Sequence, residues 1–209
     1  MRIVKEHDER RNEIIRTAAV LFSQKGYNKC SVNDILNAIG IAKGTFYYYF
    51  KSKEDVLDAA VEQVSEQVFM QVQKVAARKE VSPIERMIQV LLAARVTDPT
   101  EEVLIQEMHK SNNALLHQKT LVSIITMLTP IFGEIVEEGN ETGIFQCAYP
   151  EQCVQILLSA MLTLLNDGIF LLDKTQAAKV FEALIYTMEK MLGVKDGTFY
   201  ERMCEHRKF

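Results

Sequence analysis

The chain has 209 residues, of which 48% are hydrophobic and 25% are charged. This composition is typical of a globular protein, and the length allows one large domain or two small ones. We see no apolar run that approaches the roughly 18 residues of a membrane-spanning helix, and no apolar stretch of a signal peptide near the first residue. We therefore expect a cytoplasmic protein without membrane contact.

The net charge of −4 is unevenly distributed along the chain. Residues 1–53 hold ten Lys/Arg and five Asp/Glu, a net of +5, whereas residues 54–209 carry a net of −9. We call residues 1–53 the head and residues 54–209 the body. A basic head on an acidic body concentrates the electrostatic attraction for a polyanion at one end of the chain. The charge pattern therefore favours a nucleic-acid partner for the N-terminal part.

The cysteines and histidines do not follow the spacing of a metal site such as C-x-x-C. We expect reduced thiols, no metal and no cofactor. The sequence also contains no Gly-rich phosphate loop, no nucleophile motif and no carboxylate pair that its context singles out, so we expect neither catalytic residues nor an enzyme. The residues concerned are Cys30, Cys147, Cys153, Cys204, His7, His109, His117 and His206.

Apolar residues at helical spacing predict a first helix over about 8–24. Ser31 and Asp34 then form the pattern of a capping box, which predicts a short helix from Val32 that ends at Gly40. After a short bend, residues 43–49 form a second short helix. Two short helices at this spacing are typical of a helix-turn-helix.

The second short helix leaves unusual side chains in solvent. If Phe46 and Phe50 are buried, then Lys43, Tyr47 and Tyr48 project outwards. A cation, phenols and a neighbouring glycine are groups that bind phosphate oxygens and base edges. The alternative is that the YYYF run belongs to the core or to a strand, but the flanking helix signals leave no room for a pairing strand.

The run GIAKGTFYYYFKSK, residues 40–53, resembles the DNA-binding signature of the TetR family of bacterial transcriptional regulators. The resemblance implies a helix-turn-helix domain over 1–52 and an effector-binding and dimerisation domain over 53–209. It departs at Ala42, where the family usually has a capping Ser or Thr. The DNA-binding residues that it implies are Ser31, Lys43, Gly44, Thr45, Tyr47, Tyr48, Tyr49 and Lys53.

The rest of the chain contains helical patterns and no strand pattern. A long helix without internal Gly or Pro is expected from Lys53 to about Lys79, where it joins head to body. We expect further helices over about 83–95, 99–117, 119–138, 150–172 and 174–192, with a polar loop over 139–143 and a possible short last helix. The predicted fold is all-α with about nine to ten helices.

The predicted helix over 150–172 is apolar on nearly every side between Val154 and Leu165. A helix of this kind is buried on all sides, and a body of this size covers only part of it. We therefore expect a homodimer that forms through the helices over 150–172 and 174–192.

The resemblance implies a repressor that a small, largely apolar effector releases from a palindromic operator. Methionines scattered through the body suit an adaptable pocket, although at each single position a core role is the simpler interpretation. Two alternatives remain open: the body binds a protein partner, or the chain is an architectural DNA binder without an effector. A cavity among the helices between residues 53 and 172 would favour the effector. The candidate ligand contacts are Met70, Met108, His109, Asn112, Met127 and Met161.

Overall fold

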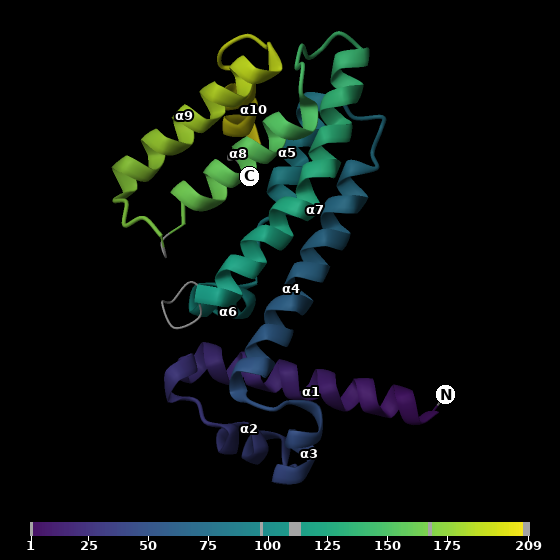
Figure 1. The fold of residues 1–209 in the computed structure, drawn as a ribbon, viewed down its shortest axis with the longest axis vertical. Helices are drawn as coiled ribbons and strands as arrows, with labels where there is room; N and C mark the ends of the chain where they lie inside the picture. The colour runs from purple at the N-terminus through teal and green to yellow at the C-terminus, as the bar shows by residue number, and fades with distance from the viewer. Residues whose placement is uncertain (1, 97, 109–113, 167–168, 207–209) are drawn as a thin grey trace. The chain divides into compact units, whose positions relative to one another are not determined.

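Figure 1 shows the computed structural model, which describes residues 2–96, 98–108, 114–166 and 169–206. In these residues the fold is all-α, as predicted, with no strand. The elements are α1 (Arg2–Lys25), the 3₁₀ helix η1 (Tyr27–Lys29), α2 (Val32–Ile39), α3 (Lys43–Tyr49), α4 (Lys53–Ala76), α5 (Pro83–Ala93), α6 (Pro99–Met108), α7 (Ala114–Glu141), α8 (Pro150–Leu164), α9 (Lys174–Leu192) and α10 (Thr198–His206).

The chain forms two compact units, which share α4. The first unit comprises Met1–Gln67 and Val96–Leu116, and the second comprises Val68–Arg95 and His117–Phe209. The first unit is larger than the predicted DNA-binding domain because α6 packs against α1. The predicted domains, 1–52 for DNA binding and 53–209 for effector binding and dimerisation, were defined by their expected roles and not by compactness. They therefore stay a prediction.

The start of α2 is a capping box, as the sequence predicts. Ser31 Oγ accepts a hydrogen bond from the Asp34 amide at 3.2 Å, and the Asp34 carboxylate accepts one from the Ser31 amide at 2.8 Å. Gly40 ends the helix with a φ of 77°, which is a left-handed conformation that favours glycine. Ala42 precedes α3 without a side-chain cap, as expected from its methyl group.

The core of the head holds α3 in place. Apolar side chains from α1, α2 and α3 meet there, and α1 and α2 pack closely against each other. Burial of a large apolar side chain contributes about 1.5–3 kcal/mol to folding, so these contacts fix the helix despite its seven residues. The residues that are almost completely buried are Ile14, Ile15, Ala18, Phe22, Ile35, Phe46 and Phe50.

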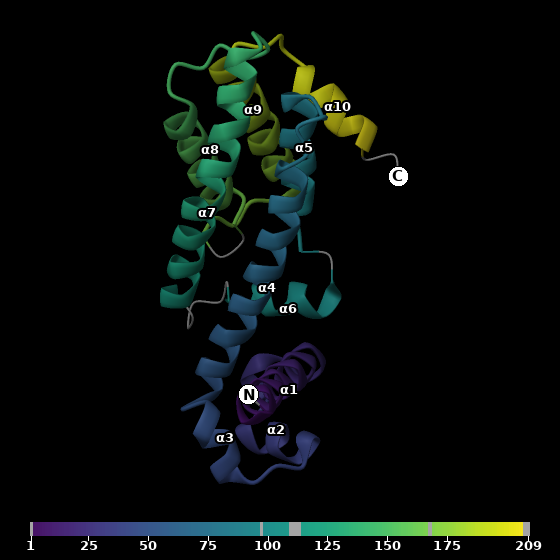
Figure 2. The ribbon, with the colours of Figure 1, turned by 90° about the vertical axis from the view of Figure 1, so that its right-hand side faces the viewer.

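The second unit has a separate core. Side chains of α5, α7, α8 and α9 form most of it, and Val72 of α4 is buried in it as well. In this unit α8 packs against α9, and α10 packs against both α5 and α9 (Figure 2). The side chain of Glu189 on α9 accepts hydrogen bonds from the amides of Gly197 at 2.8 Å and Phe199 at 2.7 Å. A buried carboxylate thus caps the first turn of α10.

Several expected boundaries are wrong. The first helix begins at Arg2 and not near residue 8, and residues 114–117, which were expected at the end of the helix over 99–117, belong to α7. The helix α7 continues through Gly139, where a loop was expected, because this glycine serves close packing: a Cβ there would lie 2.0 Å from the Phe145 ring. The helix α8 ends at Leu164 and does not reach residue 172. Beyond its end, the buried Asn166 side chain hydrogen-bonds His117 Nε2 at 2.9 Å, and the amide of Phe170 donates to the Asn166 carbonyl.

One stretch of α7, His117–Glu141, is long and apolar enough by composition to cross a membrane, contrary to the expectation that no such run exists. Four of its apolar side chains, Leu128, Phe132, Ile135 and Val136, belong to the buried core of the second unit. About a third of an 18-residue window of this stretch is buried (33%), so the protein interior accounts for part of the hydrophobicity of α7.

Candidate functional site

The helix α3 separates its side chains into a buried and an exposed set. Phe46 is fully buried, whereas Tyr47 is 47% and Tyr48 71% exposed. Lys43 is also exposed, and its Nζ lies 5.8 Å from the centre of the Tyr47 ring. Because one helix turn separates Phe46 from Phe50, fixing both in the core leaves the opposite face of α3 in solvent.

Gly44 lies on this exposed face. A Cβ built at this position would meet nothing within 4 Å, and the backbone is not in the left-handed conformation. Neither the turn nor the packing therefore requires glycine here. A glycine that neither the backbone conformation nor the packing requires is consistent with a surface that another molecule approaches closely.

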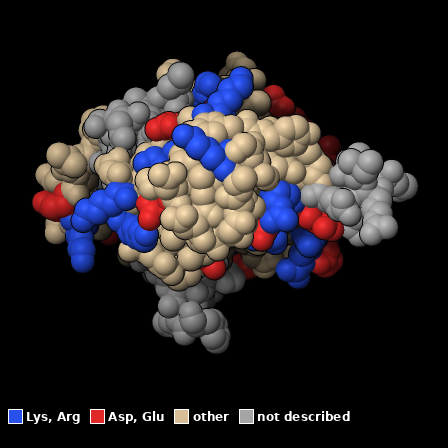
Figure 3. Space-filling view, turned by 90° about the horizontal axis from the view of Figure 1, so that it is seen from below, with Lys and Arg blue, Asp and Glu red and all other residues tan. Residues whose placement is uncertain are grey.

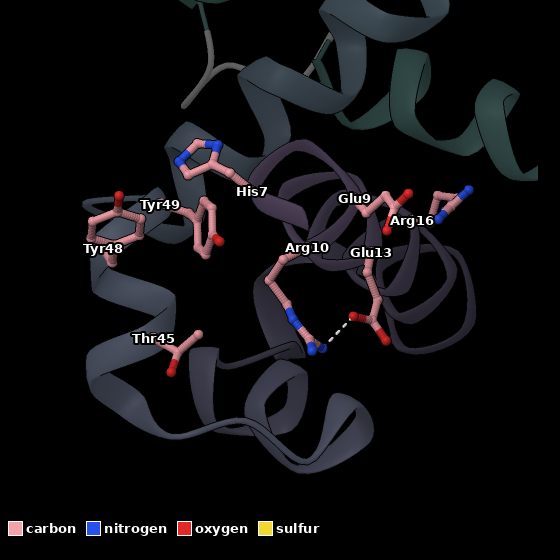
Figure 4. A pocket seen from close by; sticks show the side chains of 8 residues that line it. All are labelled: His7, Glu9, Arg10, Glu13, Arg16, Thr45, Tyr48 and Tyr49. Atoms are coloured by element: carbon pink, nitrogen blue, oxygen red, sulfur yellow. Dashed lines mark hydrogen bonds and ion pairs between the residues drawn. The ribbon is translucent and has the colours of Figure 1, made fainter. Parts of the chain in front are cut away.

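A polar groove of about 770 Å³ lies between α1 and α3 (Figure 4). The His7 ring packs there against Tyr48 and Tyr49, at centroid distances of 5.6 and 4.7 Å, and Arg10 hydrogen-bonds Glu13. From the sequence alone, neither His7 nor Arg10 was singled out as a DNA contact. The lining residues are His7, Glu9, Arg10, Glu13, Arg16, Thr45, Tyr48 and Tyr49.

Two of the predicted DNA-binding residues have internal partners. Lys53 Nζ donates to the carbonyl oxygens of Tyr27 at 2.8 Å and Cys30 at 3.0 Å, so at least two of its three donors are occupied. The hydroxyl of Ser31 donates to the Asp34 carboxylate at 2.6 Å and caps α2. Both residues therefore have a structural role in the head, and Lys53 is a weaker candidate for a phosphate contact than the sequence indicates.

An ion pair joins the end of α1 to the start of α2. Lys25 Nζ lies 2.7 Å from Asp34 Oδ1. The hydrogen bond from Lys25, with those from Ser31, holds the pKa of the Asp34 carboxyl well below its usual range, and the same pairing raises the pKa of Lys25. The negative charge of Asp34 is therefore balanced by Lys25 within the fold. Figure 3, which views the molecule from below, shows Lys and Arg groups around a broad uncharged area, with Asp and Glu groups interspersed among them.

The second unit contains a cavity of about 470 Å³. Its wall is apolar apart from Arg95, which is the one charged residue among the described residues that line it. The walls come from α5, α7, α8, α9 and α10 and not from α4. The lining residues are Met87, Leu91, Ala94, Arg95, Ile124, Leu128, Phe132, Val154, Leu157, Leu158, Met161, Leu162, Leu165, Phe181, Leu184, Ile185, Met188 and Met203.

Of the candidate ligand contacts, Met161 lines this cavity. Met70 does not line it, and its side chain is 55% exposed. In this part of α4, Val68 and Val72, each two residues from Met70, point towards the core, so Met70 points away from it. Met127 packs against the core beside the cavity. The side chains of Met108, His109 and Asn112 lie outside the described residues.

Residues 14–60 match the family model described as "Bacterial regulatory proteins, tetR family", and residues 96–187 match "Tetracyclin repressor-like, C-terminal domain". Together the two matches cover about two thirds of the chain and include the helix-turn-helix. The chain belongs to the TetR family. It is thus a helix-turn-helix transcriptional regulator, in a family without enzymatic activity.

Two curated relatives, both named as HTH-type transcriptional regulators or repressors, show how local the sequence similarity is. The transcriptional repressor KstR2 of Mycolicibacterium smegmatis is 29% identical over 85 residues, 41% of each chain. The uncharacterised regulator YuxN of Bacillus subtilis is 53% identical over 49 residues, 23% of this chain and 17% of YuxN. In both cases the match spans less than half of the relative's length.

Solved TetR structures match over most of the chain. A TetR/AcrR regulator from Thermobifida fusca is 26% identical with a TM-score of 0.59, over 90% of this chain and 99% of that one. A TetR regulator from Pectobacterium atrosepticum is 18% identical with a TM-score of 0.63, over 90% and 96% of the two chains. The second comparison shows a common fold alone.

Proposed function

We propose that this protein is a homodimeric repressor that binds a palindromic DNA operator through α3 and is released by a small, largely apolar effector. The exposed face of α3 is the observation that carries the proposal. Lys43 and the phenols of Tyr47 and Tyr48 suit phosphate oxygens, and Gly44 and Thr45 allow a close approach to base edges. We propose a cytoplasmic location, because the DNA target of a bacterial regulator lies there.

The groove between α1 and α3 supports the same interface. Tyr49 and Thr45 line it on one side and Arg10 on the other, so a DNA strand that follows α3 would meet a cation from α1. Ser31 remains at the exposed start of α2 and adds a hydroxyl to the surface. Phosphate contacts of this type position a protein without reading sequence.

The dimer is proposed to form through α8 and α9. These helices pack together, and they leave Ile156 61% and Tyr186 54% exposed. Apolar side chains of this size on adjacent helices are suited to a symmetric interface, in which the same patch meets its copy. A two-fold dimer presents two copies of α3, as a palindromic operator requires.

The proposed effector site is the apolar cavity of the second unit, whose volume falls within the usual range of about 300–1,000 Å³ for small-molecule sites. The connection to the head is α4, a continuous helix of 24 residues that belongs to both units. An effector that binds the non-operator state 100-fold more tightly supplies only about 2.7 kcal/mol, so release should be graded with effector concentration. The KstR2 relative is named a repressor, which supports repression over activation.

Fluorescence anisotropy with a labelled duplex tests the DNA-binding part. We expect salt-dependent binding by the wild type, and a loss of at least tenfold in Lys43→Ala and Tyr48→Ala, since each removes one phosphate contact. Val122→Ala is the control, because Val122 is 58% exposed on α7, outside the proposed interface. Equal affinity of all four proteins, or no binding by the wild type, would refute the proposal.

A further inference from the structure

The cavity of the second unit is elongated. Along α8 and its C-cap the lining runs from Val154 to Leu165, a separation of eleven residues that corresponds to about 16 Å of helix. Along α5 and the two residues after it the lining runs from Met87 through Leu91 to Arg95, about 12 Å. Arg95 lies two residues beyond Ala93, the last residue of α5, so the charge lies at one end of this lining.

Among the described residues, the guanidinium of Arg95 has no ion-pair partner, and its side chain is exposed. Arg86, on α5, contrasts with it: that side chain is buried and pairs with Glu138. Arg86 of α5 therefore has an internal partner, whereas Arg95, just beyond α5, lines the slot.

An apolar slot with a cation at one end selects ligands by charge. A carboxylate matches the planar fork of a guanidinium and accepts two parallel hydrogen bonds from it. A ligand with a cationic head is repelled, and a neutral one gains only the apolar contacts. A multiply charged head would be neutralised only in part, because the described lining offers a single cation.

We propose that the ligand of this cavity is an amphiphilic carboxylate, with its apolar body along α8 and its carboxylate at Arg95. The inference rests on the proposed effector function and names the chemical class of the effector. The apolar part of the lining holds the chain, and the charge at Arg95 sets its direction. Met161 lies within the apolar part, and Met203 of α10 adds to the wall.

Isothermal titration calorimetry on the full-length protein, with three probes of equal chain length, tests the proposal. The probes are decanoate, 1-decanol and decyltrimethylammonium. We expect decanoate to bind about tenfold more tightly than decanol, and decyltrimethylammonium to bind most weakly. Added salt should reduce the preference for decanoate, because Arg95 is exposed to solvent.

Variants locate the charge and the slot. Arg95→Met should abolish the preference for decanoate without changing decanol binding, and Arg95→Lys should retain part of it. Arg202→Met is the matched control, since Arg202 is an exposed arginine of α10 that does not line the cavity. Met161→Trp should fill the slot and weaken both decanoate and decanol.

Two results would overturn the inference: equal affinity of wild type and Arg95→Met for decanoate, or decanoate binding that survives Met161→Trp. Measuring DNA binding in the same samples separates this inference from the proposed function. If decanoate binds as expected but does not weaken DNA binding, the effector role fails and the ligand class stands. If the wild type binds DNA but does not distinguish decanoate from decanol, the ligand class fails and the DNA-binding function stands.

Discussion

Lys53 Nζ donates a hydrogen bond to the Tyr27 carbonyl at 2.8 Å and lies 4.0 Å from the centre of the Tyr27 ring. The first residue of α4 thus holds the turn between α1 and α2 through both a carbonyl and an aromatic face. The Cys30 carbonyl accepts from the same ammonium at 3.0 Å. This lysine stabilises the head, where the sequence motif alone indicates a DNA contact.

Substitution of the two motif lysines should separate stability from binding. We expect Lys53→Met to lower the free energy of unfolding by about 1.5–3 kcal/mol, the usual contribution of hydrogen bonds to a charged group. Lys43→Met should leave stability within about 0.5 kcal/mol, because Lys43 is exposed, and should weaken DNA binding. Urea denaturation and anisotropy on both variants check this. A stable Lys53→Met that loses DNA affinity would instead assign Lys53 to the interface.

Two glycines of the motif should behave in opposite ways. Gly44→Ala has room in the protein and raises helix propensity, so the head should keep or gain up to about 1 kcal/mol of stability. The added methyl should nevertheless reduce DNA affinity if the backbone of α3 approaches DNA closely. Gly40→Ala should destabilise the head, because φ is 77° there. If Gly44→Ala binds DNA as well as the wild type does, the close approach is ruled out.

The Lys25–Asp34 pair predicts a pH dependence of stability. Folding lowers the pKa of Asp34, so its contribution is fully present above the unfolded pKa of about 3.9 and is lost as pH falls towards the folded value. Asp34→Asn should therefore be less stable than the wild type at neutral pH, with a difference that shrinks as the pH drops below about 5. Denaturation midpoints of both proteins between pH 7 and 3 measure the difference. A constant difference would show that charge is not its source.

Charge placed on the proposed dimer face should produce monomers. Ile156→Asp and Tyr186→Asp each bury a carboxylate in the interface, at a cost of several kcal/mol. Val122→Asp is the control, because Val122 is as exposed as Ile156 but lies on α7. Sedimentation velocity at micromolar concentration distinguishes the outcomes. Dimers that persist in both α8 and α9 variants, or that dissociate in the α7 variant, would place the interface elsewhere.

The helix-turn-helix could be predicted because its signals are local. The capping box at Ser31, the stop at Gly40 and the spacing of Phe46 and Phe50 each act within one or two helix turns, and the structure contains all of them. The exposed side of α3 follows from the same periodicity. For these residues, local rules and tertiary packing agree.

The parts that could not be predicted depend on contacts between distant segments. Lys53 donates hydrogen bonds to carbonyls more than twenty residues away in the sequence. Gly139 lies against the Phe145 ring, although a glycine at this position in the sequence predicts a loop.

The cavity combines residues from five helices. The apolar periodicity of each helix predicts only that these residues are buried, and it does not distinguish a cavity wall from a filled core. Of the predicted methionines whose side chains the structure describes, Met161 lies in the wall and Met70 and Met127 do not. The wall also contains Met87, Met188 and Met203, which the sequence did not single out.

Selection from a random duplex library tests the central claim that a dimer reads DNA through α3. The wild-type protein should enrich a pseudo-palindrome whose half-sites are centred about 34–36 Å apart, or a multiple of that spacing. Tyr47→Ala should enrich the same sequence with weaker overall binding, because phosphate contacts position the protein without specifying sequence. A wild-type selection that yields no palindrome, or an Ile156→Asp monomer that enriches the same full site with equal affinity, would contradict the account.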